Sequence, residues 1–206
     1  YVAVHAADLD LAPSQTLGVI GESGSGKSTL ALAVLGLLPH QGKLSVAGSN
    51  WIEAQRNRQT SALRQRIQVV FQDPYSSLNP NDKSIDAVSE AVRFVKNCSR
   101  EEAEIRSKEL LSEVGFDLRL AGASPHEMSG GQRQRLCIAR ALASDPKVLI
   151  LDEAVAALDP LVQKQVLDLL LGLQRDRGLA YIFITHNLEV ARAIAHRIVF
   201  LEKGEQ

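Results

Sequence analysis

The chain has 206 residues, with 23 Lys and Arg against 24 Asp and Glu, which gives a formal net charge of −1 at pH 7. This balance argues against a nucleic-acid binder, which needs an excess of basic side chains to neutralise backbone phosphates. Hydrophobic residues make up 45% of the chain and charged residues 23%, as in folded globular domains rather than disordered segments. The length fits one domain, built in one or two lobes.

No apolar stretch reaches the roughly 20 residues that a membrane-spanning helix needs. The longest apolar stretches lie at 29–39 and 167–173. The two cysteines, Cys98 and Cys137, form no C-x-x-C motif, which favours a reduced, cytosolic setting over a disulfide framework or a zinc site.

The N-terminus lacks the basic and apolar regions of a signal peptide. The chain opens on Tyr1 rather than Met, and residues 1–4 already have strand character. We therefore expect a piece of a longer polypeptide.

Five short runs of apolar, β-prone residues predict strands. In chain order they lie at 16–20, 67–71, 147–151, 180–184 and 197–201. The runs are continuous rather than alternating, as in strands that helices cover on both faces. The sequence therefore predicts an α/β fold with a mostly parallel sheet.

Between the second and third predicted strands lie about 75 residues with little strand character. The run S-R-E-E at 99–102 is a capping-box pattern, which predicts a helix reaching Val114. This segment indicates a helical insertion in the α/β core. Two ion pairs between residues four apart are expected along the helix: Glu102 with Arg106, and Glu104 with Lys108.

A phosphate-binding motif follows the first predicted strand. The run at 21–29 fits G-x-x-x-x-G-K-[ST] between a strand and a helix, the context that this motif requires. Its glycines let successive backbone N–H groups point at one anion, and the helix N-terminus adds a positive dipole. Lys27 suits the β- and γ-phosphates, and the Ser28 hydroxyl suits Mg²⁺. The predicted nucleotide-binding residues are Gly21, Glu22, Ser23, Gly24, Ser25, Gly26, Lys27, Ser28 and Thr29.

A pair of carboxylates, Asp152 and Glu153, follows the strand predicted at 147–151. The end of that strand places both residues at the C-terminal edge of the sheet, beside the phosphate-binding loop. Asp152 is predicted to hold Mg²⁺ through water, and Glu153 to polarise an attacking water. The loop alone leaves kinases, GTPases, helicases and transport ATPases open.

The run M-S-G-G-Q at 128–132 resembles the L-S-G-G-Q signature of ATP-binding cassette (ABC) ATPases, with Met in place of Leu. The start of a helix with unencumbered backbone N–H groups can grip the γ-phosphate of an ATP bound to another subunit. The signature residues expected to contact nucleotide are Ser129, Gly130, Gly131 and Gln132.

The resemblance implies an α/β fold: a P-loop NTPase (RecA-like) core with a mostly parallel sheet, an N-terminal antiparallel β portion and an inserted α-helical subdomain. It implies a single ABC ATP-binding domain over residues 1–206. The core lobe is expected at 1–73 and 144–206, and the helical, signature-bearing subdomain at 74–143.

Three further positions match motifs of the family in the expected order. The resemblance implies that Gln72 contacts Mg²⁺ or the attacking water, that His186 contacts the γ-phosphate, and that Asp159 reaches across a dimer interface to the nucleotide. The catalytic residues implied in this way are Glu153, His186 and Gln72. The implied Mg²⁺ ligands are Ser28, Gln72 and Asp152.

Within the family, the run F-Q-D-P-Y-S-S-L-N-P at 71–80 resembles the ATPases of dipeptide, oligopeptide and nickel importers. The runs at 66–71 and 179–188 are most similar to the C-terminal cassette of the tandem peptide importer ATPases that also take up microcin C. The resemblance implies an ATP-hydrolysing subunit or cassette that energises import of peptides or related small solutes. It implies ATP and Mg²⁺ as cofactors and a peripheral place on the cytoplasmic side of the inner membrane. The implied partners are a second cassette in a head-to-tail ATP sandwich and transmembrane permease subunits, with no nucleic acid.

The chain departs from the family pattern in three further places. Ala-Val-Ala stands at 154–156 where Pro-Thr-Ser is usual, which keeps nucleotide binding but leaves hydrolysis open. Asn187 replaces the usual Asp and keeps an acceptor oxygen without the charge. The adenine-stacking aromatic is expected before the first strand, where only Tyr1 is near.

These departures keep one alternative open, a partner cassette that binds nucleotide and hydrolyses it weakly. A DNA-repair or chromosome-structure ATPase is disfavoured, because Lys27 and Ser129 lie only 102 positions apart with no heptads or Cys clusters between them. A translation-associated cassette is disfavoured by the importer-like run at 71–80 and by the absence of a basic arm from the sequence.

Overall fold

The structure is a computed structural model that describes residues 2–56 and 60–206. The chain divides into two compact units. Unit 1 comprises Tyr1–Val69, Lys147–Glu153 and Leu171–Gln206, and unit 2 comprises Val70–Pro146 and Ala154–Leu170.

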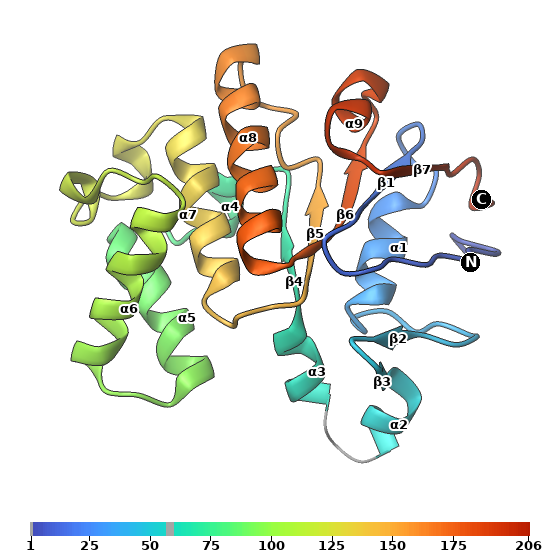
Figure 1. Ribbon diagram of the computed structural model, residues 1–206, viewed down its shortest axis with the longest axis horizontal. Helices are drawn as coiled ribbons and strands as arrows, with labels where there is room; N and C mark the ends of the chain where they lie inside the picture. Colours follow the sequence, from blue (N-terminus) through green and yellow to red (C-terminus); the bar gives the residue numbers. More distant parts are fainter. Residues whose placement is uncertain (1, 57–59) are drawn as a thin grey trace. The chain divides into compact units, whose positions relative to one another are not determined.

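Unit 1 is built on a five-stranded sheet in the order β4-β5-β6-β1-β7 (Figure 1). The strands are β1 (Thr16–Ile20), β4 (Ile67–Val70), β5 (Val148–Asp152), β6 (Ala180–Thr185) and β7 (Arg197–Phe200). β1 pairs in parallel with β6 and with β7, and β5 pairs in parallel with β6. Every residue of β1 and β6 is buried, as their continuous apolar runs predict. The predicted parallel sheet is confirmed, with strand ends at most one residue from the expected positions.

Among the described residues, four helices lie wholly in unit 1. They are α1 (Lys27–Val34), α2 (Trp51–Arg56), α3 (Thr60–Arg66) and α9 (Leu188–Ile194). Two of them pack on this sheet: α9 packs on β1 and β6, and α1 packs on β5. The core between them is apolar: its buried members include Leu17, Val19, Ala31, Leu35, Trp51, Ile67, Ile150, Ile182 and Ile184.

The expected antiparallel portion is a short pair, β2 (Ser45–Val46) with β3 (Ser49–Asn50). The prediction of a strand at 1–4 is wrong for the residues described, 2–4, because a strand needs a ladder of backbone hydrogen bonds. The isolated parallel bridge nearest to this segment pairs Ala6, two residues further on, with Glu205. Tyr1 itself, the nearest candidate for the adenine-stacking aromatic, lies outside the described residues.

Unit 2 holds the helices between β4 and β5, as the lack of strand character there predicts. They are α4 (Pro74–Ser77), α5 (Ser84–Lys96), α6 (Arg100–Glu113), the 3₁₀ turns at Leu118–Leu120 and Pro125–Glu127, and α7 (Gly130–Leu142). α5, α6 and α7 pack against one another, and α4 packs on α7 (Figure 1). A further helix, α8 (Pro160–Arg177), begins in unit 2 and ends in unit 1. Among the described residues no helix is both long and apolar enough to cross a membrane.

α6 begins at the predicted capping box. The Ser99 hydroxyl accepts a hydrogen bond from the Glu102 backbone N–H at 3.2 Å, and the Glu102 carboxylate accepts one from the Ser99 N–H at 2.9 Å. The helix ends at Glu113, one residue before the expected Val114, which is the C-cap. The pair Glu104–Lys108 is also confirmed, with the charged atoms 2.8 Å apart.

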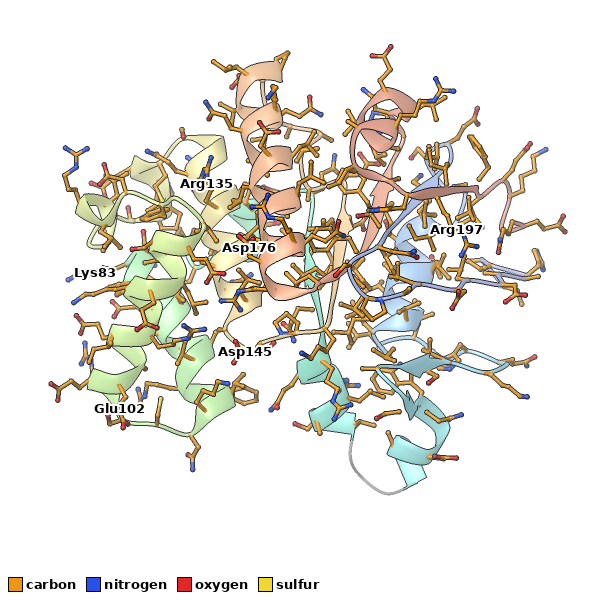
Figure 2. The ribbon with its side chains drawn as sticks, viewed as in Figure 1. Lys83, Glu102, Arg135, Asp145, Asp176 and Arg197 are labelled. Atoms are coloured by element: carbon orange, nitrogen blue, oxygen red, sulfur yellow. The ribbon has the colours of Figure 1, made fainter. Side chains whose placement is uncertain are left out.

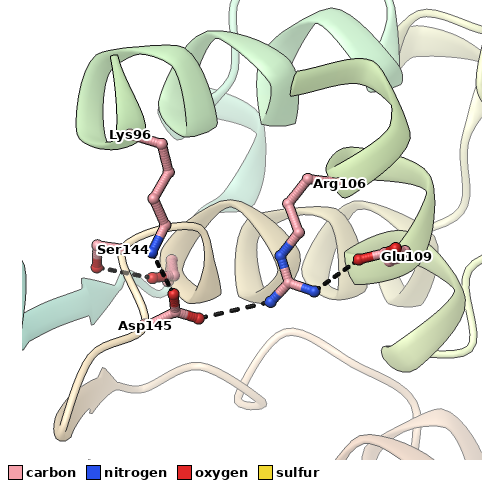
Figure 3. A network of polar contacts seen from close by, with 6 residues as sticks. Lys96, Arg106, Glu109, Ser144 and Asp145 are labelled. Atoms are coloured by element: carbon pink, nitrogen blue, oxygen red, sulfur yellow. Dashed lines mark hydrogen bonds and ion pairs between the residues drawn. The ribbon is translucent and has the colours of Figure 1, made fainter. Parts of the chain in front are cut away.

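The expected pair between Glu102 and Arg106 is wrong. At the start of α6, the Glu102 carboxylate accepts hydrogen bonds from the Ser99 N–H and hydroxyl. A second carboxylate, that of Asp145, lies at the end of α7 (Figure 2). Arg106 instead bonds Glu109 at 2.8 Å and Asp145 at 3.5 Å, and Lys96 also bonds Asp145 (Figure 3). A residue remote in sequence has therefore replaced the local partner.

Candidate nucleotide site and signature helix

The phosphate-binding motif lies in the loop between β1 and α1. Gly24 and Gly26 have φ values of +80° and +106°, in the left-handed region that glycine enters without strain. Gly26 is the N-cap of α1, and no side chain caps this helix. The backbone N–H groups of the first turn of α1 are therefore left without a side-chain cap, as an anion site requires.

Lys27 is 6% exposed and extends into this loop. Its ammonium donates to the carbonyl oxygens of Gly21 at 2.8 Å and Glu22 at 2.7 Å. The carbonyl groups of the loop thus hold the ammonium within the loop that the motif predicts to bind the β- and γ-phosphates. The buried Ser25 hydroxyl has no hydrogen-bond partner among the described residues, which fits a loop that completes its hydrogen bonds with an anion.

Asp152 ends β5 and hydrogen-bonds the Ser28 hydroxyl at the start of α1. Burial raises the pKa of the Asp152 carboxyl; the negative charge of Glu153 adds to this effect, while the bond from Ser28 and the charge of Lys27 oppose it. A carboxylate and a hydroxyl oxygen side by side are ligands that Mg²⁺ prefers, so these two residues fit the ion.

Glu153 and His186 meet at the ends of neighbouring strands. His186 Nδ1 lies 3.0 Å from Glu153 Oε2. The parallel register pairs Asp152 with Ile184, so the residues that follow β5 and β6 emerge at the same edge. Glu153 has a φ of +49°, a conformation that costs a residue with a side chain about 1–3 kcal/mol and that clusters at functional sites.

The signature residues form the start of α7. Ser129 and Gln132 make a capping box: the Ser129 N–H donates to Gln132 Oε1 at 2.8 Å, and the Gln132 N–H donates to Ser129 Oγ at 3.3 Å. The Ser129 hydroxyl keeps its own proton for a further bond. A Cβ on Gly131 would lie 2.4 Å from Val162 Cγ1, so glycine lets α7 approach α8 closely within unit 2.

Gln72 lies in unit 2, two residues beyond the end of β4, and is exposed. It lines a cavity of about 170 Å³. The lining residues are Gln72, Asp73, Pro74, Tyr75, Gly130, Arg133, Gln134, Ala154, Ala157 and Leu158. Unit 1 therefore holds the predicted residues from Gly21 to Thr29 with Asp152, Glu153 and His186, and unit 2 holds Gln72, the signature and Asp159.

Sequence reasoning missed Tyr75 and Arg133, which line this cavity, and His126; Tyr75 contacts both of the other two. A signal was present, because Tyr75 stands just after Gln72 and His126 just before the signature. Their separation of 51 positions hid the contact.

Residues 4–156 match the family described as ABC transporter. The chain belongs to the ABC transporter family. The glutathione import ATP-binding protein GsiA of Escherichia coli O1:K1 / APEC is 46% identical over 203 residues, which are 98% of this chain and 33% of GsiA. A putative peptide import ATP-binding protein of Brucella abortus (strain 2308) is 44% identical over 204 residues, 98% of this chain and 61% of that protein. The chain thus spans a third to three fifths of these curated relatives.

A solved structure of an ABC protein has the same fold. The dimeric structure of a post-hydrolysis state of the ATP-binding cassette MJ0796, bound to ADP and Pi, superposes with a TM-score of 0.85 at 29% identity. The match covers 98% of this chain and 88% of that one. It confirms the α/β fold with a five-stranded parallel sheet, a small antiparallel pair and helical additions, and it shows that cassettes of this family dimerise.

In this ABC domain the departures at 154–156 have a structural setting. Ala154 and Val155 are buried, whereas Ala156 is exposed. The side chain of Asp159 caps α8, accepting from the Val162 N–H at 3.1 Å. Asn187 caps α9 in the same way, accepting from the N–H groups of Glu189 and Val190. The acceptor oxygen that Asn shares with Asp is therefore in use.

Proposed function

We propose that the chain is the ATP-binding and ATP-hydrolysing part of an ABC importer for peptides or related small solutes such as glutathione. The observation that carries hydrolysis is the Glu153–His186 pair, which stands next to the metal-suited Asp152. The solute class rests on the similarity to the glutathione and peptide import proteins.

In this mechanism the loop around Lys27 binds the β- and γ-phosphates through its cation and the N–H groups of α1. Glu153 orients a water and accepts its proton as the water oxygen bonds to the γ-phosphorus and the bond from that phosphorus to the ADP oxygen breaks. His186 holds the Glu153 carboxylate in place. Ser28 and Asp152, with Gln72 as a proposed further ligand, would hold Mg²⁺, which would supply positive charge to the phosphate oxygens.

We propose that two such cassettes assemble head to tail, with Ser129, Gly130, Gly131 and Gln132 of one facing the nucleotide of the other. The dimeric relative bound to ADP and Pi supports this assembly. Asp159 is proposed to reach the same interface. Transmembrane permease subunits are the proposed membrane partners, which would place the protein peripherally on the cytoplasmic side of the inner membrane.

A cassette that binds ATP but hydrolyses it weakly is the second candidate, because the buried Ala154 and Val155 replace the usual proline and threonine. Phosphate release by the purified full-length protein, with Mg²⁺ and ATP, distinguishes the two. The hydrolytic proposal expects steady turnover that Glu153→Gln abolishes. Tight ATP binding with no phosphate release from the wild type would favour the weak partner.

A further inference from the structure

Three side chains in unit 2 form a cluster that links the segment after Gln72 to the signature helix. The Tyr75 hydroxyl lies 2.9 Å from His126 Nδ1, and the two rings meet edge to face at a centroid distance of 5.3 Å. The Arg133 guanidinium lies 5.3 Å from the centre of the Tyr75 ring, a cation–π distance. Arg133 Nε also donates to the Pro125 carbonyl at 2.6 Å, beside His126. The cluster thus joins α4, the turn before the signature and α7.

Further contacts hold α4 on α7. The Cys137 thiol lies 3.9 Å from the Pro74 carbonyl, and Arg140 donates to the Ser77 carbonyl. Burial raises the pKa of the Cys137 thiol to about 11, so it remains a neutral donor. A helix of four residues has too few internal hydrogen bonds to be stable alone. The orientation of α4 is therefore set by α7 and by the cluster.

The cluster also borders the cavity of about 170 Å³, whose lining includes both Gln72 and Gly130. One wall is made by Tyr75 and Arg133. The Gln134 amide lines the same space; it is 1% exposed, and its Nε2 has no hydrogen-bond partner among the described residues. Gln72 and Gly130 thus line the same space as Tyr75 and Arg133, whose contact joins the two sides of it.

We propose that Tyr75, His126 and Arg133 form a positioning clamp that fixes Gln72 relative to the start of the signature helix. The proposal rests on the proposed ATPase function and deepens it. The hydroxyl bond and the ring contacts are directional, so they set an angle as well as a distance. Gln72 is proposed to act on the nucleotide of its own subunit, and the signature residues on the nucleotide of the partner subunit. The clamp couples the positions of Gln72 and the signature residues to each other. Tyr75 and Arg133 are positioning residues; in the proposed mechanism they contact neither ATP nor the attacking water.

The test uses the full-length protein with Tyr75→Phe, Tyr75→Ala and His126→Ala, and Phe94→Ala as the matched control. Phe94 is 82% exposed on α5, outside the cluster, and its removal should change nothing. Tyr75→Ala should leave ATP affinity within about twofold, because the phosphate loop belongs to unit 1, and lower kcat by at least about fivefold. Wild-type kcat in Tyr75→Ala would overturn the clamp.

A double-mutant cycle between Tyr75→Phe and His126→Ala isolates the hydroxyl bond. The kcat of the double variant should fall no further than that of either single variant. His126→Gln restores a hydrogen-bond partner for the Tyr75 hydroxyl, so its kcat should be higher than that of His126→Ala. Multiplicative losses would contradict the clamp even if Tyr75→Ala fails to fold.

Hydrogen–deuterium exchange separates failure of the clamp from failure of the proposed function. If the wild type neither binds nor hydrolyses ATP, the proposed function is wrong. The clamp is still tested, because Tyr75→Phe should speed amide exchange in α4 and the first turn of α7 and leave α5 unchanged. The clamp would be overturned if Tyr75→Phe and the wild type exchanged at the same rate in all three segments.

Discussion

His186 Nδ1 lies 3.0 Å from Glu153 Oε2, although 33 positions separate the two residues in the chain. The contact joins the ends of β6 and β5, next to Asp152. Glu153 takes up its position with a left-handed backbone conformation, and its N–H donates to the Ile184 carbonyl at 2.9 Å. The imidazole therefore orients the carboxylate that we propose as the group that polarises water.

Glu153→Gln should trap ATP, because the amide keeps the shape of the side chain but cannot accept a proton. The domain alone should be a monomer of low activity, and it should stay monomeric without nucleotide. ATP should then convert the variant from monomer to dimer, while ADP, which lacks the γ-phosphate, should not. Light scattering with each nucleotide, run beside a phosphate-release assay, measures both effects. If the replacements at 154–156 have already disabled hydrolysis, the wild type and the variant should behave alike, both with negligible turnover.

Lys27→Ala should lower ATP affinity at least about tenfold and abolish turnover, because it removes the cation that Gly21 and Glu22 hold in the phosphate loop. Titration with a fluorescent nucleotide measures the affinity. Lys108→Ala is the matched control, since it removes an exposed lysine paired with Glu104 on α6. Equal affinity in the two variants would refute the assignment of the loop.

Gly131→Ala should destabilise the protein by about 1–3 kcal/mol, because the new methyl group would lie 2.4 Å from Val162 Cγ1. Gly122→Ala is the control: a methyl group there meets nothing within 4 Å, and the change should stay within about 0.5 kcal/mol. Urea unfolding of both variants gives the comparison. Similar midpoints would show that α7 and α8 do not need the glycine.

Glu102→Gln should lower the melting temperature at neutral pH by on the order of 2 °C and have no effect in acid. Hydrogen bonds from the Ser99 backbone N–H and, to a smaller extent, from the Ser99 hydroxyl hold the pKa of the Glu102 carboxyl below its ordinary value of 4.5. The ionised group therefore stabilises the fold above pH 4.5, and this contribution disappears as the pH falls through the lowered pKa. Melting curves between pH 7 and about pH 3 test this, with the exposed Glu101→Gln as control. A difference that does not depend on pH would contradict it.

The sequence alone determined the features that contiguous residues encode. The motif at 21–29, the capping box at Ser99 and the five apolar runs depend on spacing within one segment, and backbone geometry converts such spacing directly into loops, helix starts and buried strands. The parallel sheet, the phosphate loop and the family resemblance followed from these segments.

Only the tertiary structure decided the contacts between distant segments. Arg106 bonds Asp145 rather than Glu102, and Tyr75 meets His126 across 51 positions. Local spacing cannot predict such pairs, because a side chain bonds the best-placed partner that packing provides, and packing depends on which elements become neighbours. The Glu153–His186 pair is the clearest case, since the order of β5 and β6 in the sheet, a property of the whole core, brings its two members together.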